Sequence, residues 1–200
     1  MASKKKIIAP VMFMLLITVL YTSVLAFINE STKGIISEQE QLRIKRSVLY
    51  VFNMKSDGTS DEVNQLFDES VTTEEVDGTT VYTRMENGAA TGYALAYTGK
   101  GLWGSISGYI GFSPDFTEVL GIDFVAHSET PGLGGRIDEP WFKEQFRGIT
   151  VDSVETLVIK PSDGGNIDGI TGATLTSVAV VNIVNQFIID TLAFAKEANL

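Results

Sequence analysis

The chain has 200 residues, and its 25 acidic against 15 basic side chains give a formal net charge of −10. Its hydrophobic fraction of 44% excludes a disordered chain, and the acidic balance excludes a protein that binds nucleic acid through clustered lysine and arginine. The absence of cysteine excludes disulfides, thiolate metal sites, thiol nucleophiles and a lipoprotein anchor. With a single histidine, His127, no metal site is expected.

The N-terminus predicts a membrane anchor. Lys4, Lys5 and Lys6 precede 22 residues, from Ile7 to Ile28, that include no charged side chain. As a helix rising about 1.5 Å per residue, this segment spans a hydrocarbon core about 30 Å thick. A cleaved signal peptide is the alternative, but its apolar region is usually about 7–15 residues long. Since Leu25-Ala26-Phe27 also offers no clean cleavage site, we expect an uncleaved anchor.

The lysine cluster also predicts the orientation of the chain. Basic residues favour the cytoplasmic side, so the N-terminus is expected inside and the chain after Ile28 outside the cytoplasmic membrane. This outer part carries a net charge of −13, because the three lysines are excluded from it. Anionic lipid would repel such a domain.

Two helical segments are expected after the anchor. Apolar residues at helical spacing from Glu38 to Phe52 predict a stalk helix that continues from the anchor. Thr59 and Glu62 form a possible capping box that opens a short helix over 63–67. Serine and threonine hydroxyls inside the anchor are tolerable because they can bond back to carbonyls of their own helix.

The pattern then changes to strands. Asn87-Gly88 is a strong hairpin signal, Ser113-Pro114-Asp115 reads as a turn, and the segment from Gly99 to Gly104 as a glycine-rich bend. These breaks separate four expected strands, over 79–85, 90–97, 105–112 and 118–126.

The remaining segments complete an α+β prediction. A short helix is expected over 138–146, a strand over 155–159 and a long helix over 175–195 that packs on the sheet. The expected architecture is one N-terminal transmembrane helix followed by an extracytoplasmic domain, in which helices pack on an antiparallel sheet. The expected divisions are 1–28 for the lysine cluster and anchor, 29–70 for the stalk and helical segment, and 71–200 for the main domain.

The first segment suited to chemistry runs from Asp168 to Ser177 and leads straight into the last helix. A helix N-terminus has unpaired N–H groups and a partial positive charge, so it is a natural seat for a phosphate. Gly169 and Gly172 would let the backbone approach an anion closely. From spacing alone, an ordinary helix cap by Thr171 or Thr174 is the simpler explanation.

The second segment is the loop from His127 to Gly135, which contains three glycines and one proline. A structural connection explains such a loop equally well, although loops on a rigid scaffold often carry ligands. A proton-transfer role for His127 is one possibility, and a structural histidine is the simpler one.

Three sequence motifs together resemble the FMN-binding domain family. They are Asp168-Gly169 before Thr171-Gly172-Ala173-Thr174, the run Glu129-Thr130-Pro131-Gly132-Leu133-Gly134, and Gly101-Leu102-Trp103-Gly104. The resemblance covers nearly the whole chain and is specific because of the number and order of the motifs. Within the family, the chain resembles G subunits of Rnf complexes and, less closely, C subunits of sodium-translocating NADH:quinone reductases.

The resemblance implies FMN as cofactor, attached through its phosphate to Thr174 by a separate flavin transferase that uses FAD and magnesium. Leu102, Trp103 and Leu133 are expected to cover the isoalloxazine ring, and Glu129 and Thr130 to contact its polar edge. The full expected binding set is Thr174, Thr171, Gly172, Ala173, Leu175, Thr176, Glu129, Thr130, Gly132, Leu133, Gly134, Leu102 and Trp103.

The implied function is electron transfer within a membrane complex that couples ferredoxin–NAD electron transfer to ion movement. The expected partners are the other subunits of this complex. The chain alone is expected to show no turnover, since it has no nicotinamide fingerprint and no iron–sulfur ligands. Three alternatives remain open: the corresponding NADH:quinone reductase subunit, a stand-alone extracellular electron-transfer protein, and a membrane-tethered, non-redox binding module.

Overall fold

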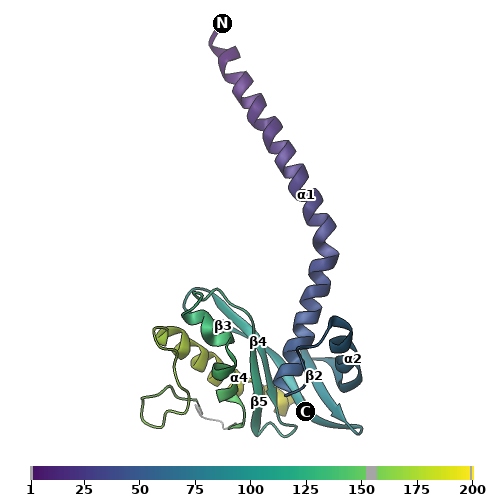
Figure 1. Cartoon of the computed structure of the whole chain (residues 1–200), viewed down its shortest axis with the longest axis vertical. Coiled ribbons are helices and arrows are strands. Elements are labelled where there is room, and N and C mark those ends of the chain that lie inside the picture. Colours follow the sequence, from purple (N-terminus) through teal and green to yellow (C-terminus); the bar gives the residue numbers. More distant parts are fainter. Residues whose placement is uncertain (1, 152–156, 199) are drawn as a thin grey trace. The chain divides into compact units, whose positions relative to one another are not determined.

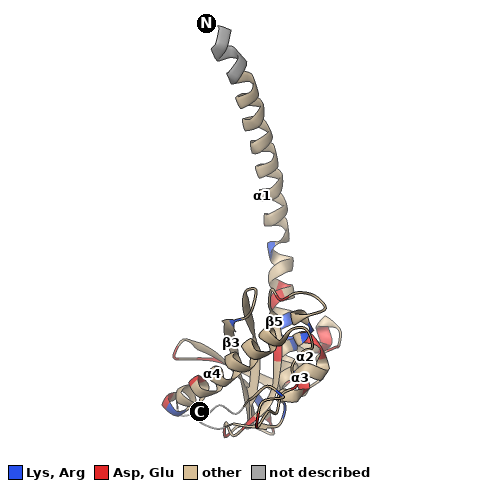
Figure 2. Cartoon of the chain, turned by 90° about the vertical axis from the view of Figure 1, so that its left-hand side faces the viewer, with Lys and Arg blue, Asp and Glu red and all other residues tan. Residues whose placement is uncertain are grey.

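The computed structural model describes residues 2–151, 157–198 and 200, and the chain divides into two compact units, 1–41 and 42–200. From Ala2 onwards the first unit is helical and forms the beginning of α1 (Ala2–Val51) (Figure 1). Apart from the half-buried Ile17, its large apolar side chains from Ile8 to Ile36 are exposed, and no charged side chain lies between Ile8 and Asn29 (Figure 2). The Thr18 and Ser23 hydroxyls donate to helix carbonyls four residues earlier, as predicted, at 2.8 Å and 2.7 Å. The unit therefore has the length and composition of a membrane-spanning helix.

The second unit is built on one antiparallel six-stranded sheet with sequential strand order. The strands are β1 (Val71–Val76), β2 (Thr79–Glu86), β3 (Ala89–Lys100), β4 (Ser105–Phe112), β5 (Glu118–Ala126) and β6 (Ile149–Thr150). The four predicted strands are confirmed to within three residues at either end. Asn87 and Gly88 have φ values of 52° and 79°, as the tight hairpin turn requires.

Helices cover both faces of the sheet. Successive residues of its central strands point to opposite sides, and both sides include apolar residues that must be buried. On one face Leu95 and Ile110 pack with α4 (Thr174–Ala198). On the other face Ala94 and Tyr109 pack with the end of α1 and with α2 (Ser60–Ser70). The predicted fold class is thus confirmed. The last turns of the expected stalk are part of a hydrophobic core, with Leu49 fully buried.

Arginine side chains hold the end of α1 within this second unit. Arg147 donates to the carbonyls of Tyr50 and Val51 at 3.3 Å and 3.2 Å, and Arg84 donates to that of Phe52 at 3.3 Å. The last carbonyls of a helix have no partner inside the helix, and a cation there also complements the helix dipole. The guanidinium groups thereby fix the C-terminal end of α1 to the sheet.

Some local predictions were incomplete or wrong. The capping box of Thr59 and Glu62 is present, but the helix it opens is longer than expected. The predicted helix over 138–146 is broken into η1 (Gly134–Asp138), α3 (Pro140–Lys143) and η2 (Glu144–Phe146). Of the strand predicted over 155–159, residues 155 and 156 lie outside the described residues. The rest forms only one isolated bridge, from Ile159 to Ile167, so that prediction was wrong for the described part.

Candidate binding site

Three segments that are far apart in the sequence meet around one cavity of about 220 Å³. They are the bend after β3, the glycine-rich loop after β5, and the start of α4. Its walls are formed by Leu102, Trp103, Glu129, Thr130, Leu133, Gly134, Gly172, Ala173 and Thr176. All nine belong to the thirteen residues singled out from the sequence. The other four, Thr171, Gly132, Thr174 and Leu175, are exposed and lie in the same segments.

The loop before α4 is held at several points. The amide side chain of Gln145 pairs with the backbone of Asp168, accepting from its N–H at 2.7 Å and donating to its carbonyl at 3.3 Å. The buried Ser177 hydroxyl accepts from Ile170 N–H at 2.9 Å and donates to the carbonyl of Ala173 at 3.1 Å. The loop therefore has a fixed shape without a ligand. No local sequence pattern marks Gln145, because its partner lies 23 residues away, whereas Ser177 ends the segment that the sequence had singled out.

The first N–H groups of α4 are free to bind a ligand. In the part of the chain that the structure describes, the backbone N–H groups of Thr174, Leu175 and Thr176 have no hydrogen-bond acceptor. Within the same residues, neither the Thr171 nor the Thr174 hydroxyl caps the helix. Ordinary capping by these threonines therefore does not explain the segment. Unpaired N–H groups and the helix dipole together favour a bound anion.

The rim of the cavity is apolar and exposed. The exposed fractions of its apolar lining residues are 69% for Trp103, 46% for Leu133 and 44% for Leu102. Exposed apolar side chains gathered around a cavity indicate a binding surface. The site thus combines anion-binding N–H groups with apolar cover, and the exposed Thr174 hydroxyl lies at the start of the helix.

Glu129 lines the cavity, and its carboxylate is hydrogen-bonded within the protein. Its side chain is buried, and it accepts hydrogen bonds from Leu102 N–H at 2.8 Å, Trp103 N–H at 3.2 Å and the Thr176 hydroxyl at 2.7 Å. Both carboxylate oxygens therefore already have partners within the protein. Glu129 connects the three segments that form the cavity.

The single histidine supports the same loop. His127 Nδ1 accepts from the backbone N–H of Glu129 at 3.2 Å, and its Nε2 lies 2.9 Å from a carboxylate oxygen of Asp138. With both ring nitrogens engaged, His127 has the contacts of a structural histidine, the simpler of the two possibilities that the sequence left open.

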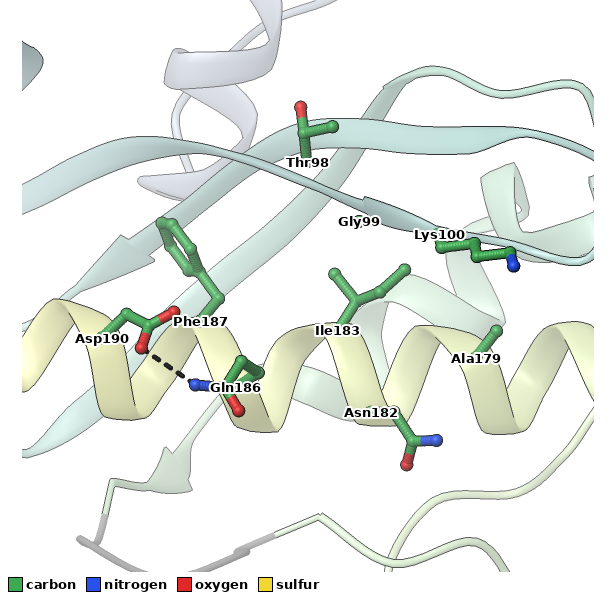
Figure 3. Close-up of a pocket in the computed structure, with 9 residues that line it drawn as sticks. All are labelled: Thr98, Gly99, Lys100, Ala179, Asn182, Ile183, Gln186, Phe187 and Asp190. Atoms are coloured by element: carbon green, nitrogen blue, oxygen red, sulfur yellow. Dashed lines mark hydrogen bonds between the residues drawn. The ribbon is translucent and has the colours of Figure 1, made fainter.

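A larger groove of about 390 Å³ lies between β3 and the middle of α4 (Figure 3). It is lined by Thr98, Gly99, Lys100, Ala179, Asn182, Ile183, Gln186, Phe187 and Asp190. The backbone N–H groups there are used inside the helix, and Asp190 accepts from Gln186 at 2.9 Å. It therefore lacks the free helix N–H groups found at the smaller cavity, which is the better candidate site.

Fold and site together define a class of protein: an antiparallel-sheet domain with an anion-binding cavity at the start of its last helix. Residues 101–189 match the FMN-binding domain family. The match includes all three segments of the cavity.

Two curated relatives illustrate the similarity. The G subunit of the ion-translocating oxidoreductase complex of Shewanella piezotolerans is 33% identical over 195 residues, covering 90% of this chain and 87% of that protein. The C subunit of the Na(+)-translocating NADH-quinone reductase of Pseudomonas aeruginosa is 35% identical over 118 residues, covering 54% of this chain. The chain spans only 45% of the length of that second relative.

A solved structure has the same fold. The C subunit of the Na(+)-translocating NADH-quinone reductase of Parabacteroides distasonis matches with a TM-score of 0.61 at 26% identity. The match covers 77% of this chain and 94% of that chain. The chain therefore belongs to the FMN-binding domain family, whose members include G and C subunits of ion-translocating redox complexes.

Proposed function

We propose that this protein carries FMN, attached through its phosphate to the hydroxyl oxygen of Thr174. One observation carries the proposal: an exposed threonine begins a helix whose first N–H groups are free, beside a cavity walled by the other motif residues. The N–H groups of Thr174, Leu175 and Thr176 would hold the phosphate, each favourable interaction with the helix end contributing about 0.3–1 kcal/mol.

The remaining residues would position the flavin ring. Leu102, Trp103 and Leu133 would cover its apolar faces, since they are exposed at the rim and bury apolar area when a ring is bound. Thr130 would contact a polar edge, while Glu129 would hold the cavity walls together. When bound, FMN supplies the electron transfer, and the protein supplies attachment, orientation and electrostatic environment.

The proposed role is that of an electron-transfer subunit in a membrane complex that couples ferredoxin–NAD electron transfer to ion movement, as an Rnf G subunit does. The match along 87% of the Shewanella G subunit supports this assignment. The corresponding subunit of a sodium-translocating NADH:quinone reductase is the second candidate, because C subunits match at similar identity. A non-redox binding module is a third.

The site of maturation follows from the proposed orientation. With Lys4, Lys5 and Lys6 in the cytoplasm, Thr174 lies outside the cytoplasmic membrane. A flavin transferase acting there on FAD would form the bond from phosphate to Thr174 oxygen and release AMP. The structure offers it an exposed loop whose shape is already fixed.

Intact-mass and fragmentation measurements test the attachment. The full chain, purified from cells that contain a flavin transferase, is expected to gain one FMN at Thr174. Thr174→Val is expected to lose the adduct because it has no hydroxyl, whereas Thr171→Val, in the same exposed loop, keeps it. An unmodified wild-type chain under these conditions would reject covalent attachment and favour the binding module.

The choice between the two complexes needs native membranes. If the chain is an Rnf subunit, reduced ferredoxin bleaches its flavin absorbance and the chain copurifies with iron–sulfur subunits of that complex. Bleaching by NADH, together with copurification of quinone reductase subunits, would assign it to the other complex. Purification without any membrane subunit would instead indicate the stand-alone electron-transfer protein.

A further inference from the structure

The Glu129 carboxylate, in the loop after β5, hydrogen-bonds to both of the other segments of the cavity. One oxygen, Oε1, accepts from Leu102 and Trp103 N–H in the bend after β3. The other, Oε2, accepts from the Thr176 hydroxyl in the first turn of α4. The side chain is only 4% exposed, so water cannot replace these donors easily.

The glycines of two motifs lie directly against this carboxylate. A Cβ atom at Gly101 would lie 2.6 Å from Glu129 Oε1, and one at Gly134 would lie 2.8 Å from Oε2. Neither glycine has a positive φ. Glycine is therefore required at these two positions because a side chain would not fit, and not because the backbone conformation is unusual. These two glycines therefore make room for Glu129, which links the two motifs physically.

The Glu129 carboxylate is held by neutral hydrogen-bond donors. Among the described residues no lysine, arginine or histidine forms an ion pair with it, and all three of its donors are neutral groups. A carboxylate buried in this way depends on its hydrogen bonds. Because little water screens the negative charge of this carboxylate, that charge acts strongly on groups bound in the cavity.

We propose that Glu129 is the positioning residue of this site: its buried carboxylate joins the three cavity segments and places in the cavity wall a negative charge that has no ion-pair partner among the described residues. The part that concerns charge rests on the proposed function, because it acts on the flavin in that cavity. Adding an electron to a flavin is harder beside a negative charge, so Glu129 lowers the reduction potential of the bound flavin.

Two substitutions distinguish the structural role of Glu129, joining the cavity segments, from the electrostatic role of its charge. In Glu129→Gln the amide oxygen still accepts from Leu102 and Trp103, and the amide nitrogen donates to the Thr176 hydroxyl, which can also accept. In Glu129→Leu none of the three hydrogen bonds remains. Glu118→Leu, the same change at an exposed position on β5, is the matched control.

Hydrogen exchange on the flavin-free full chain in detergent tests the assembly. In Glu129→Leu the amides of Leu102 and Trp103 are expected to exchange about tenfold faster or more, because they lose a hydrogen bond to a buried carboxylate. Glu129→Gln and Glu118→Leu are expected to keep the wild-type rates. Unchanged rates in Glu129→Leu, or rates in Glu129→Gln as fast as those in Glu129→Leu, would overturn the assembly role.

Spectroelectrochemical titration of the flavin-loaded Glu129→Gln protein tests the charge. Its reduction potential is expected to be more positive than that of the wild type, a change that a purely structural role would not produce. An equal or lower potential would overturn the electrostatic role. Since the exchange measurement requires no flavin, it decides the assembly role even if the proposed attachment to Thr174 fails.

Discussion

At the residue scale, glycines at this site are selected for different reasons. Gly172 has a φ of 82°, which favours glycine for its backbone, whereas Gly134 is needed because of close neighbours. A Cβ at Gly134 would lie 2.6 Å from Thr176 Oγ1 and 2.8 Å from Glu129 Oε2. One added methyl group therefore disturbs the polar contacts that hold the cavity together.

We expect Gly134→Ala to lower the free energy of unfolding by about 1–3 kcal/mol, the usual range for overpacking a tight site. Gly169→Ala is the control from the neighbouring motif, because its Cβ would meet nothing closer than 3.6 Å. That variant should unfold at the wild-type denaturant concentration or slightly above it. Urea unfolding of the full chain in detergent makes the comparison, and equal midpoints for the two variants would contradict it.

At the element scale, α4 connects the site to the core. The buried Asn185 side chain accepts from Leu157 N–H at 3.0 Å and donates to the carbonyl of Leu157 at 2.9 Å. These two bonds resemble those of a neighbouring strand. They attach the segment that leads towards the site to the helix on which the site begins.

Asn185→Ala is expected to lower the free energy of unfolding by about 2–4 kcal/mol, because it leaves the backbone N–H and carbonyl of the buried Leu157 without partners. Asn182 lies about one turn earlier on α4, at the groove drawn in Figure 3, and it is exposed, so Asn182→Ala should change the free energy of unfolding little. Denaturant unfolding curves of both variants check the difference. A wild-type midpoint for Asn185→Ala would show that water or another group replaces both bonds.

The contacts that hold the end of α1 predict that the free energy of unfolding depends on pH. The hydrogen bonds from Arg147 hold the pKa of Glu144 below its ordinary value; partial burial opposes this shift, and the hydroxyl of Tyr50, which donates at 2.6 Å, supports it. A carboxyl group with a lowered pKa in the folded state stabilises the fold above its unfolded-state pKa. This stabilisation is lost as pH falls through the folded-state pKa.

Unfolding free energies between about pH 6 and pH 3 should therefore fall more steeply for the wild type than for Glu144→Gln, which cannot titrate. The difference between the two proteins isolates Glu144 from the other carboxylates of this acidic chain. Parallel pH profiles would mean that the Arg147 contact does not contribute to stability. Added salt should reduce this stabilisation in part, because the Glu144 side chain is 45% exposed although that of Arg147 is only 21% exposed.

At the scale of the whole molecule, the orientation in the membrane is a prediction that the absence of cysteine makes easy to test. Single cysteines introduced by Ser3→Cys and Ser162→Cys give one reporter on each side of the expected anchor. In intact spheroplasts an impermeant maleimide should label Ser162→Cys and not Ser3→Cys, whereas permeabilised cells should label both. The reverse pattern would place Thr174 in the cytoplasm, away from the expected transferase.

Some features of this protein are determined by short stretches of sequence. The uncharged run from Ile7 to Ile28, the Asn87-Gly88 turn and the capping box of Thr59 and Glu62 depend on neighbouring residues only, so they could be predicted. The strand β1 was missed because its four central residues are polar and exposed, which suits a charged sheet edge and hides the usual alternation.

The candidate site likewise has features that the sequence predicts and features that it does not predict. The sequence indicated the residues of the cavity through motifs, and the structure brings nine of them together. What only the tertiary structure decided is which side chains hold them there. Glu129 reaches donors 26, 27 and 47 residues away, and Gln145 reaches Asp168 across 23 residues. Such contacts depend on how the sheet and α4 pack, and spacing along the chain does not encode that packing.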